Sequence, residues 1–278
     1  MTGEIIRVGV CGAAGRMGRT VVTAIAGADG LDLVTAIDTQ EVGKDAGFLA
    51  GIGHIGVDIC RDLLTALRET RTDVMVDFSL PDAVMDNAAT ALRAGVATVI
   101  GTTGLSQSDL EELDRLARQK NLGVFVAPNF AIGAVLLMQF AAQAARYMPD
   151  VEIIELHHEN KLDSPSGTAL LTAQKIGQAR HQARVRPQPA PANTMQKAEG
   201  ARGARDHKTC DVPVHSVRLP GFVAHQEVIF GGIGQTLTLR HDSMDRTSFM
   251  PGVILAVRRI GSLPGLTVGL ENLLDLSG

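Results

Sequence analysis

The fold is decided by one stretch near the N-terminus, Ile5-Ile6-Arg7-Val8-Gly9-Val10-Cys11-Gly12-Ala13-Ala14-Gly15-Arg16-Met17-Gly18-Arg19. A short β-rich run leads directly into glycines at 12, 15 and 18, and a helical pattern follows from Thr20 to Ile25. The spacing G-x-x-G-x-x-G is a variant of the dinucleotide fingerprint G-x-G-x-x-G. The early glycines permit a tight turn and let the backbone approach a pyrophosphate, and Gly18 lets helix and strand pack closely. On its own, such a turn is equally typical of a plain tight connection between a strand and a helix.

The residues after this turn favour the nucleotide interpretation. The next apolar run, 31–37, ends in Asp38, twenty residues after Gly18. An acid at this distance is expected to accept hydrogen bonds from a ribose diol. Residue 39 is Thr, so no basic side chain directly follows Asp38 to meet a 2′-phosphate, which Asp38 itself would repel. We therefore favour NADH over NADPH, with NADPH left open.

Three further strands are predicted in the same rhythm, at 73–79, 97–100 and 123–126. Helices are predicted after the first two, to about Ala94 and from Ser108 to about Gln119. Near-continuous apolar strands that alternate with helices predict an α/β fold with a Rossmann-type, doubly wound parallel sheet. Ligands bind such sheets at the carboxyl ends of the strands. The segments expected at this rim are Gly12–Gly18, Asp38, Phe78-Ser79, Gly101–Thr103 and Ala127–Phe130.

The second half of the chain follows another pattern. A long apolar helix to Tyr147 precedes a strand that begins at Val151 and a helix to about Arg180. Residues 181–209 are rich in Ala, Pro, Gln and Arg and are expected to be a surface segment. Runs at 212–219, 223–230 and 235–239, joined by glycine turns, predict an α+β domain with an open antiparallel or mixed sheet. A last helix at 249–260 is expected to return to the first domain. The predicted domains are 1–130, completed by 241–278, and 131–240.

Composition excludes several classes of function. The 278-residue chain has no Trp, one Tyr and a net charge of −4, which argues against a nucleic-acid partner. Cys11, Cys60 and Cys210 have no CxxC spacing, which favours a reducing compartment over disulfides or zinc. The N-terminal residues have no signal-peptide pattern, and the most apolar window, 130–145, is short for a membrane span. We expect a cytoplasmic protein with no membrane partner.

Titratable groups are concentrated at Glu155-Leu156-His157-His158-Glu159-Asn160-Lys161-Leu162-Asp163-Ser164-Pro165-Ser166-Gly167-Thr168-Ala169. This stretch connects a predicted strand to a predicted helix. Ser166 or Thr168 is a natural helix N-cap, and the amides of Gly167 and Thr168 would face outward as donors for a carboxylate. Lys161 is interpreted as a solvated loop charge, a counter-ion or a proton donor.

The two histidines are adjacent in the sequence. On an extended strand they would point to opposite faces, so they make a poor metal pair. No third ligand stands at helical or turn spacing, and we predict no metal site. A buried histidine is most often a hydrogen-bonded structural residue, but the nearby Lys161 and Ser-Gly-Thr favour a chemical role here. The chain also contains no G-x-S-x-G, Walker A or H-E-x-x-H sequence, which removes the commonest hydrolase and nucleotidase interpretations.

Four motifs together resemble the 4-hydroxy-tetrahydrodipicolinate reductase family, the dihydrodipicolinate reductases of bacterial lysine and diaminopimelate biosynthesis. These motifs are residues 12–18, Ile100-Gly101-Thr102-Thr103-Gly104, Pro128-Asn129-Phe130 and His157-His158-x-x-Lys161-x-Asp163-x-Pro165-Ser166-Gly167-Thr168-Ala169. The last motif is far more specific than the first. The resemblance extends from residue 5 to the C-terminal Asn272-Leu273-Leu274-Asp275-Leu276. Ser164 stands where the family usually has Ala, and Thr39 stands where some members have Arg, which leaves coenzyme preference open.

The resemblance implies an N-terminal Rossmann domain completed by the C-terminal helix, and a mixed substrate domain whose sheet builds a homotetramer. It implies a small cyclic dicarboxylate substrate that is reduced by NADH or NADPH with loss of water. His157 would be the proton donor and acceptor and Lys161 a proton donor, while substrate would be held by His158, Ser166, Gly167 and Thr168. The cofactor would contact Gly12, Ala13, Ala14, Gly15, Arg16, Met17, Asp38, Gly101, Thr102, Thr103, Ala127, Pro128, Asn129 and Phe130.

Two alternatives remain at this point. One is another two-domain amino- or keto-acid dehydrogenase, which would need the nucleotide half but not the arrangement from Lys161 to Thr168. The other is a nicotinamide-binding sensor without turnover, which would tolerate loss of His157.

Overall fold

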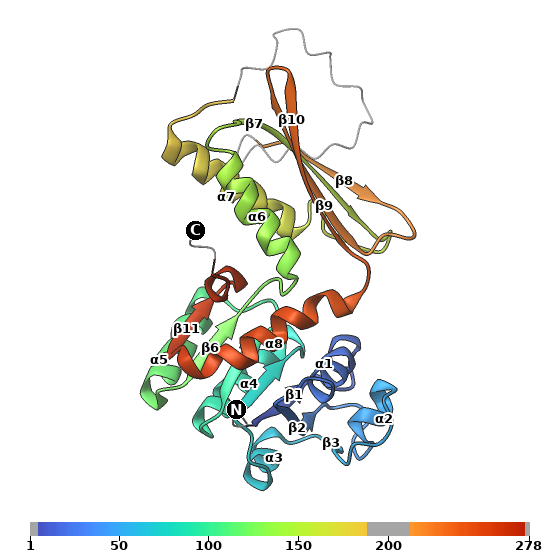
Figure 1. The fold of residues 1–278 in the computed structure, drawn as a ribbon. Helices are drawn as coiled ribbons and strands as arrows, with labels where there is room; N and C mark the ends of the chain where they lie inside the picture. Colours follow the sequence, from blue (N-terminus) through green and yellow to red (C-terminus); the bar gives the residue numbers. More distant parts are fainter. Residues whose placement is uncertain (1–4, 188–211, 276–278) are drawn as a thin grey trace. The chain divides into compact units, whose positions relative to one another are not determined.

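A computed structural model describes residues 5–187 and 212–275. Contacts divide the chain into two compact units, each with its own sheet (Figure 1). Unit 1 runs to Ile132 and resumes at Arg246, whereas unit 2 is Gly133–Asp245.

Unit 1 contains a seven-stranded sheet in the order β11-β6-β5-β4-β1-β2-β3, and every pair of neighbouring strands is parallel. The central strands are buried along their length because helices cover both faces, which explains their continuous apolar runs. This arrangement confirms the predicted doubly wound sheet. The strands are β1 (Ile6–Cys11), β2 (Leu31–Ile37), β3 (Ile59–Cys60), β4 (Val74–Asp77), β5 (Ala97–Ile100), β6 (Gly123–Val126) and β11 (Gly265–Val268).

The helices of unit 1 form two groups (Figure 1). Helix α4 packs against α3 and α5, while α1 packs against α2 and α8. Most begin at a local signal, such as the Ser106–Asp109 capping box of α5 and the Asp62 cap of α3. The helices are α1 (Arg16–Ala26), α2 (Ala46–Ala50), α3 (Leu63–Glu69), α4 (Pro81–Arg93), α5 (Gln107–Lys120), α8 (Met250–Arg259) and the 3₁₀ turns η1 (Arg246–Phe249), η2 (Ile260–Ser262) and η3 (Leu270–Leu273).

Four short elements of unit 1 were not predicted from the sequence: α2, β3, α3 and β11. Strand β3 has two residues and α2 has five, so neither is long enough to show a period. Strand β11 pairs with β6 although 142 positions separate the paired residues Gly265 and Gly123. The last strand therefore extends the sheet at the edge formed by β6.

Unit 2 contains a four-stranded mixed sheet in the order β10-β9-β7-β8. Strand β8 is parallel to β7, whereas β9 is antiparallel to both β7 and β10, which confirms the predicted open mixed sheet. Helices α6 and α7 share one apolar core with the sheet, built around Leu137, Ile153, Ile176 and Phe230. The elements are α6 (Ile132–Ala144), β7 (Asp150–His157), α7 (Gly167–Ala183), β8 (Val214–Arg218), β9 (Ala224–Gly232) and β10 (Gln235–Ser243).

The predicted surface segment 181–209 is described only in part. Helix α7 continues to Ala183, three residues into that segment, and residues 188–209 lie outside the described residues. Within the described ranges, no helix has both the length and the apolar character needed to cross a membrane.

Candidate active site

The glycine-rich turn of unit 1 is closely packed against backbone atoms, both its own and those of Phe78. Gly12 has a φ of +77°, and a Cβ placed there would lie 2.6 Å from the carbonyl oxygen of Phe78. A Cβ at Gly18 would lie 1.9 Å from the carbonyl oxygen of Gly12. Helix α1 begins after Gly15, which offers no side chain to cap the first amides. A glycine cradle with an uncapped helix start suits a pyrophosphate, so these residues fit a dinucleotide.

Asp38 stands at the end of β2, as predicted, but its carboxylate is already engaged. Oδ2 accepts a hydrogen bond from the amide of Ala14 at 2.9 Å, and Oδ1 accepts one from the amide of Gln40 at 2.9 Å. The acid therefore ties the glycine-rich turn to the loop after β2. The guanidinium of Arg61 donates to the carbonyl of Thr39 at 3.2 Å, which brings a positive charge beside residue 39. No local pattern indicated this arginine, because it follows the unpredicted strand β3.

A second buried acid organises the rim where β4 and β5 end. Asp77 is 1% exposed. It accepts hydrogen bonds from the amide and hydroxyl of Ser79 at 2.9 and 2.7 Å, from Asn87 at 2.9 Å and from Thr102 at 2.8 Å. Thr102, predicted as a cofactor contact, thus has its hydroxyl turned toward Asp77. Asp77 and Asn87 were missed as rim-organising residues, although an acid at the end of an apolar strand was an available signal.

The other predicted cofactor residues range from exposed to buried. Gly15, Arg16, Thr103 and Pro128 are exposed, Gly12, Ala14, Met17, Gly101 and Asn129 are half-buried, and Ala13, Ala127 and Phe130 are buried. The ring of Phe130 packs on Phe78 and Phe125 at centroid distances of 5.8 and 5.9 Å. Phe130 therefore supports the rim through packing in the core of unit 1.

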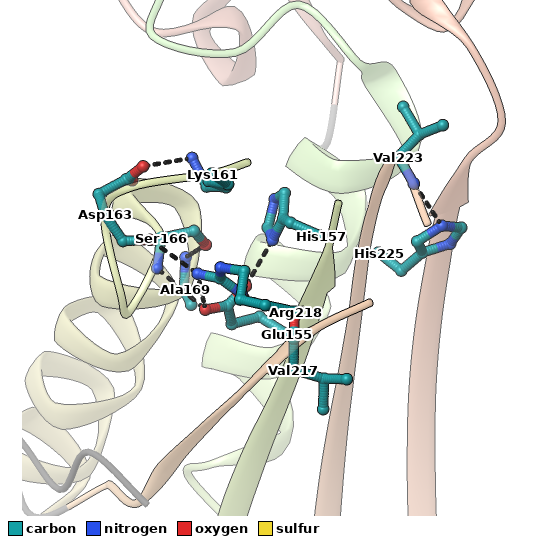
Figure 2. A network of polar contacts seen from close by, with 10 residues as sticks. All are labelled: Glu155, His157, Lys161, Asp163, Ser166, Ala169, Val217, Arg218, Val223 and His225. Atoms are coloured by element: carbon teal, nitrogen blue, oxygen red, sulfur yellow. Dashed lines mark hydrogen bonds and ion pairs between the residues drawn. The ribbon is translucent and has the colours of Figure 1, made fainter. Parts of the chain in front are cut away.

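The predicted catalytic stretch connects β7 to α7 in unit 2. Strand β7 ends at His157, and the exposed His158 lies one residue beyond it. Ser166 caps α7 by accepting a hydrogen bond from the amide of Ala169 at 3.2 Å, which confirms one of the two predicted N-caps. In the intervening loop, Lys161 Nζ pairs with Asp163 Oδ1 at 2.7 Å (Figure 2).

The centre of this region is Glu155, which is fully buried. The side chains of His157 and Arg218 both turn toward it (Figure 2). Nδ1 of His157 lies 2.5 Å from Oε2, and the guanidinium of Arg218 donates to Oε1 and Oε2 at 2.8 and 2.9 Å. Burial raises the pKa of Glu155, but the hydrogen bonds from His157 and Arg218 outweigh it and lower the pKa to about 2. Glu155 therefore stays ionised. It is bound to Arg218, which carries a positive charge, and to His157, which gains one when its ring is protonated.

Sequence reasoning placed Glu155 in the motif without a role and did not single out Arg218. The two are joined by the pairing of β7 with β8 across 63 positions. Among the residues that the structure describes, no group of three or more His, Cys, Asp or Glu side chains is arranged to hold a metal ion.

Comparison with known proteins gives two family models that together span almost the whole chain. Residues 6–130 match the N-terminus of dihydrodipicolinate reductase, and residues 133–274 match its C-terminus. The chain belongs to the dihydrodipicolinate reductase family. The family's N-terminal domain is a nicotinamide-nucleotide-binding domain, in agreement with the glycine cradle of unit 1.

Individual relatives agree with this family. The chain is 51% identical to 4-hydroxy-tetrahydrodipicolinate reductase of Desulfitobacterium hafniense (strain DSM 10664 / DCB-2), over 97% of this chain and 99% of the relative. It is 50% identical to the protein of the same name from Mycobacterium sp. (strain KMS), over 98% and 100%. The dipicolinate-bound dihydrodipicolinate reductase from Paenisporosarcina sp. TG-14 matches with a TM-score of 0.84 and 42% identity, covering 98% of this chain and 100% of that one.

Membership of the dihydrodipicolinate reductase family confirms the predicted family, fold class and enzyme class. The chain is an oxidoreductase of the lysine and diaminopimelate pathway. The alternative assignments to another amino- or keto-acid dehydrogenase and to a nicotinamide-binding sensor without turnover are therefore wrong. An amine dehydrogenase from Mycobacterium smegmatis also matches, with a TM-score of 0.66 and 19% identity, and this likeness extends to the fold alone.

Proposed function

We propose that the chain reduces (2S,4S)-4-hydroxy-2,3,4,5-tetrahydrodipicolinate to (S)-2,3,4,5-tetrahydrodipicolinate with loss of water, using NADH or NADPH. The observation that carries the proposal is the loop between β7 and α7. There an imidazole held by a buried carboxylate, a primary amine and a helix start stand within residues 157–168. We assign nucleotide binding to residues 1–130 with 241–278, and substrate binding to 131–240.

The residues that would hold the nucleotide are those of the glycine cradle and the strand ends of unit 1. Gly12 to Met17 would face the pyrophosphate, Asp38 the ribose, and Gly101 to Thr103 with Ala127 to Phe130 the rest of the rim. The bound nicotinamide supplies a hydride to the substrate ring. Asp38 would have to exchange part of its hydrogen bonding with Ala14 and Gln40 for the ribose hydroxyls.

The residues of unit 2 would manage the proton and the two carboxylates. His157 donates a proton to the ring carbon that becomes electron-rich after the hydroxyl has left as water and the hydride has been added. Lys161, now paired with Asp163, turns to a substrate carboxylate, and the amides of Gly167 and Thr168 with Ser166 and His158 bind the carboxylates. Positioning and charge complementarity contribute most of the rate, and general-acid transfer adds roughly 10²–10⁴-fold.

The direct test is an assay with the fresh condensation product of pyruvate and aspartate semialdehyde. We expect absorbance at the nicotinamide band to fall only when protein, NADH and this product are all present. Binding of NADH is seen separately as a change in its fluorescence. Binding of NADH without its oxidation in the presence of this product would overturn the proposed substrate.

We also propose that NADH is used at least as well as NADPH. Asp38 and Thr39 support NADH, whereas the Arg61 guanidinium beside the carbonyl of Thr39 gives a 2′-phosphate one positive partner. The measurement is kcat/KM for each coenzyme in the wild type and in Arg61→Ala. The variant should lose activity with NADPH and retain it with NADH. A clear NADPH preference of the wild type would contradict the proposal.

We propose a homotetramer built through the sheet of unit 2 and located in the cytoplasm. Strand register places Ile154, Leu156, Val217 and Ile229 on the face opposite α6 and α7, together with Glu152 and Glu227, and the group of apolar side chains on this face supports self-association. Free Cys11 and Cys60, among the described residues, support a reducing compartment. Light scattering should give four times the chain mass, and Ile229→Glu should lower it. A monomer at micromolar concentration would contradict the assembly.

A further inference from the structure

We propose that Glu155 and Arg218 form a positioning pair for His157, which holds Nδ1 of the imidazole so that Nε2 is the atom that exchanges the proton with substrate. This inference rests on the proposed role of His157. It adds two residues, one from β7 and one from β8, that touch neither substrate nor cofactor and act through the ring.

The first support is the saturation of Glu155. Oε2 receives His157 Nδ1 and one nitrogen of Arg218, while Oε1 receives the other nitrogen of Arg218 and, at 3.3 Å, the amide of Ser166. The carboxylate is fully buried, and the side chain of His157 is 13% exposed. A buried charge is stable only when it is paired and hydrogen-bonded, and here both conditions are met. Glu155 therefore has one well-defined position.

The second support is the tautomer that this contact imposes. Hydrogen bonds from His157 and Arg218 overcome the effect of burial and lower the pKa of Glu155 to about 2, so its oxygens only accept. Nδ1 of His157 must then carry a hydrogen. Within the described residues, no hydrogen bond uses Nε2. The ring thus has one nitrogen committed to Glu155 and one free for proton transfer.

The third support is that Arg218 also anchors the loop that carries Lys161. Its guanidinium donates to the carbonyl of Asp163 at 2.7 Å as well as to Glu155. Asp163 in turn pairs through its side chain with Lys161. One buried ion pair thus sets both the orientation of the imidazole and the path of the loop on which the amine stands. The charged groups around Glu155 are His157 on its own strand, Arg218 on β8, and Asp163 and Lys161 on the loop.

Two other histidine–carboxylate pairs in unit 2 show that this arrangement is specific to His157. His215 lies 2.7 Å from Glu152, but that carboxylate is 55% exposed, and among the described residues no Lys or Arg pairs with it. His225 is buried and lies 2.7 Å from Asp242, but its Nε2 accepts a hydrogen bond from the amide of Val223 at 3.2 Å. The first pair is open to solvent, and the second has both imidazole nitrogens engaged. Only the pair at His157 combines a fixed ring with a free Nε2 among these three.

The first experiment needs neither a variant nor turnover. Nitrogen NMR of the histidine-labelled holoprotein, with His157→Gln used to assign the resonance, reports which nitrogen carries the hydrogen. We expect Nδ1–H at neutral pH in the wild type. A neutral ring with its hydrogen on Nε2 would overturn the proposal, even if the reductase assay succeeds. Conversely, an Nδ1–H ring in a protein without reductase activity would leave the positioning intact and overturn the proposed function.

The second experiment is kinetic. Glu155→Gln keeps the shape of the side chain and removes its charge, and we expect kcat to fall roughly 10²-fold with little change in the NADH dissociation constant. As pH is raised, turnover should begin to decline at a lower pH than in the wild type. The reason is that Glu155→Gln removes the negative charge that stabilises the protonated imidazole of His157. Glu152→Gln is the matched control, since it alters a histidine–carboxylate contact of the same strand on the other face of the sheet. It should change neither kcat nor the pH at which turnover declines.

A double-mutant cycle separates positioning from a purely structural role. If Glu155 acts through the ring, adding Glu155→Gln to His157→Gln costs almost nothing further in kcat, whereas independent effects would multiply. Arg218→Lys keeps the charge and should retain more activity than Arg218→Met. An unchanged kcat in Glu155→Gln, or a full additional loss in the double variant, would overturn the proposal.

Discussion

The glycine-rich rim of unit 1 and the β7–α7 loop of unit 2 both depend on buried or half-buried acids, but they use them differently. At the rim, Asp38 and Asp77 accept hydrogen bonds from backbone amides, hydroxyls and an amide side chain, all of which are neutral. In the loop, Glu155 accepts from an imidazole and a guanidinium. The rim acids fix backbone shape, whereas Glu155 fixes a group that changes its protonation state.

This difference follows from the work proposed for each region. A rim that binds a pyrophosphate and a ribose needs a preformed surface of amides and no change of charge during the reaction. A proton donor needs a partner that tolerates both its charged and its neutral form. The Glu155–Arg218 pair provides this, because the guanidinium offsets the carboxylate charge when the ring is neutral.

The largest expected effect tests the loop itself. His157→Gln or Lys161→Ala should lower kcat by at least about 100-fold, because general-acid transfer or carboxylate binding is lost, while folding and NADH affinity stay near normal. Stopped-flow turnover and NADH titration measure the two quantities. The control is His181→Gln, an exposed histidine near the end of α7, which should retain full turnover. Near-wild-type rates in both catalytic variants would remove the assignment.

The second prediction concerns stability against pH. The pKa of Glu155 is lowered from its ordinary value of 4.5 to about 2. The ionised carboxylate therefore makes its full contribution to the unfolding free energy above pH 4.5, and this contribution is lost as pH falls toward 2. The shift corresponds to about 3 kcal/mol of unfolding free energy. Urea unfolding of wild type and Glu155→Gln should therefore differ most near neutral pH and converge in acid. A difference that is independent of pH would show that the ionised carboxylate is not what stabilises unit 2.

The third prediction concerns the backbone of the rim. Alanine is normally favoured over glycine in a helix, but a Cβ at Gly18 would lie 1.9 Å from a carbonyl oxygen. Gly18→Ala should cost about 1–3 kcal/mol of unfolding free energy and weaken NADH binding, because the turn must shift. At the other end of α1, Gly27→Ala is the control, since its Cβ would lie 3.5 Å from the nearest atom. Equal tolerance of both changes would contradict the close packing of the turn.

The elements that could be predicted from sequence are those with local signals. Strands such as β4 and β5 appear as apolar runs because both faces are covered, and the turn at Gly12 follows from its spacing. The motif from His157 to Thr168 was found for the same reason, since its residues are contiguous. Its roles came from resemblance to a family.

What could not be predicted depends on distant pairing. Arg218 meets Glu155 only because β8 lies beside β7, and no local pattern distinguishes Arg218 from a solvated strand residue. Arg61 reaches Thr39 only because the two-residue strand β3 joins the edge of the sheet. A charged residue inside an apolar run, as at Glu155, was the one available signal for a buried ion pair.

The smallest expected effect compares one interaction in both regions. Ser106 and Ser166 each cap a helix by accepting an amide hydrogen bond at 3.2 Å, from Asp109 and Ala169 respectively. Replacement of either serine by alanine should cost about 1 kcal/mol of unfolding free energy. Ser106 is exposed, so water replaces its oxygen and turnover stays unchanged. Ser166 is 3% exposed and its amide donates to Glu155, so a shift of this cap should also lower kcat. Denaturation midpoints and kcat of the two variants measure this difference, and equal turnover in both would mean that the start of α7 does not help to hold Glu155 and His157 in place.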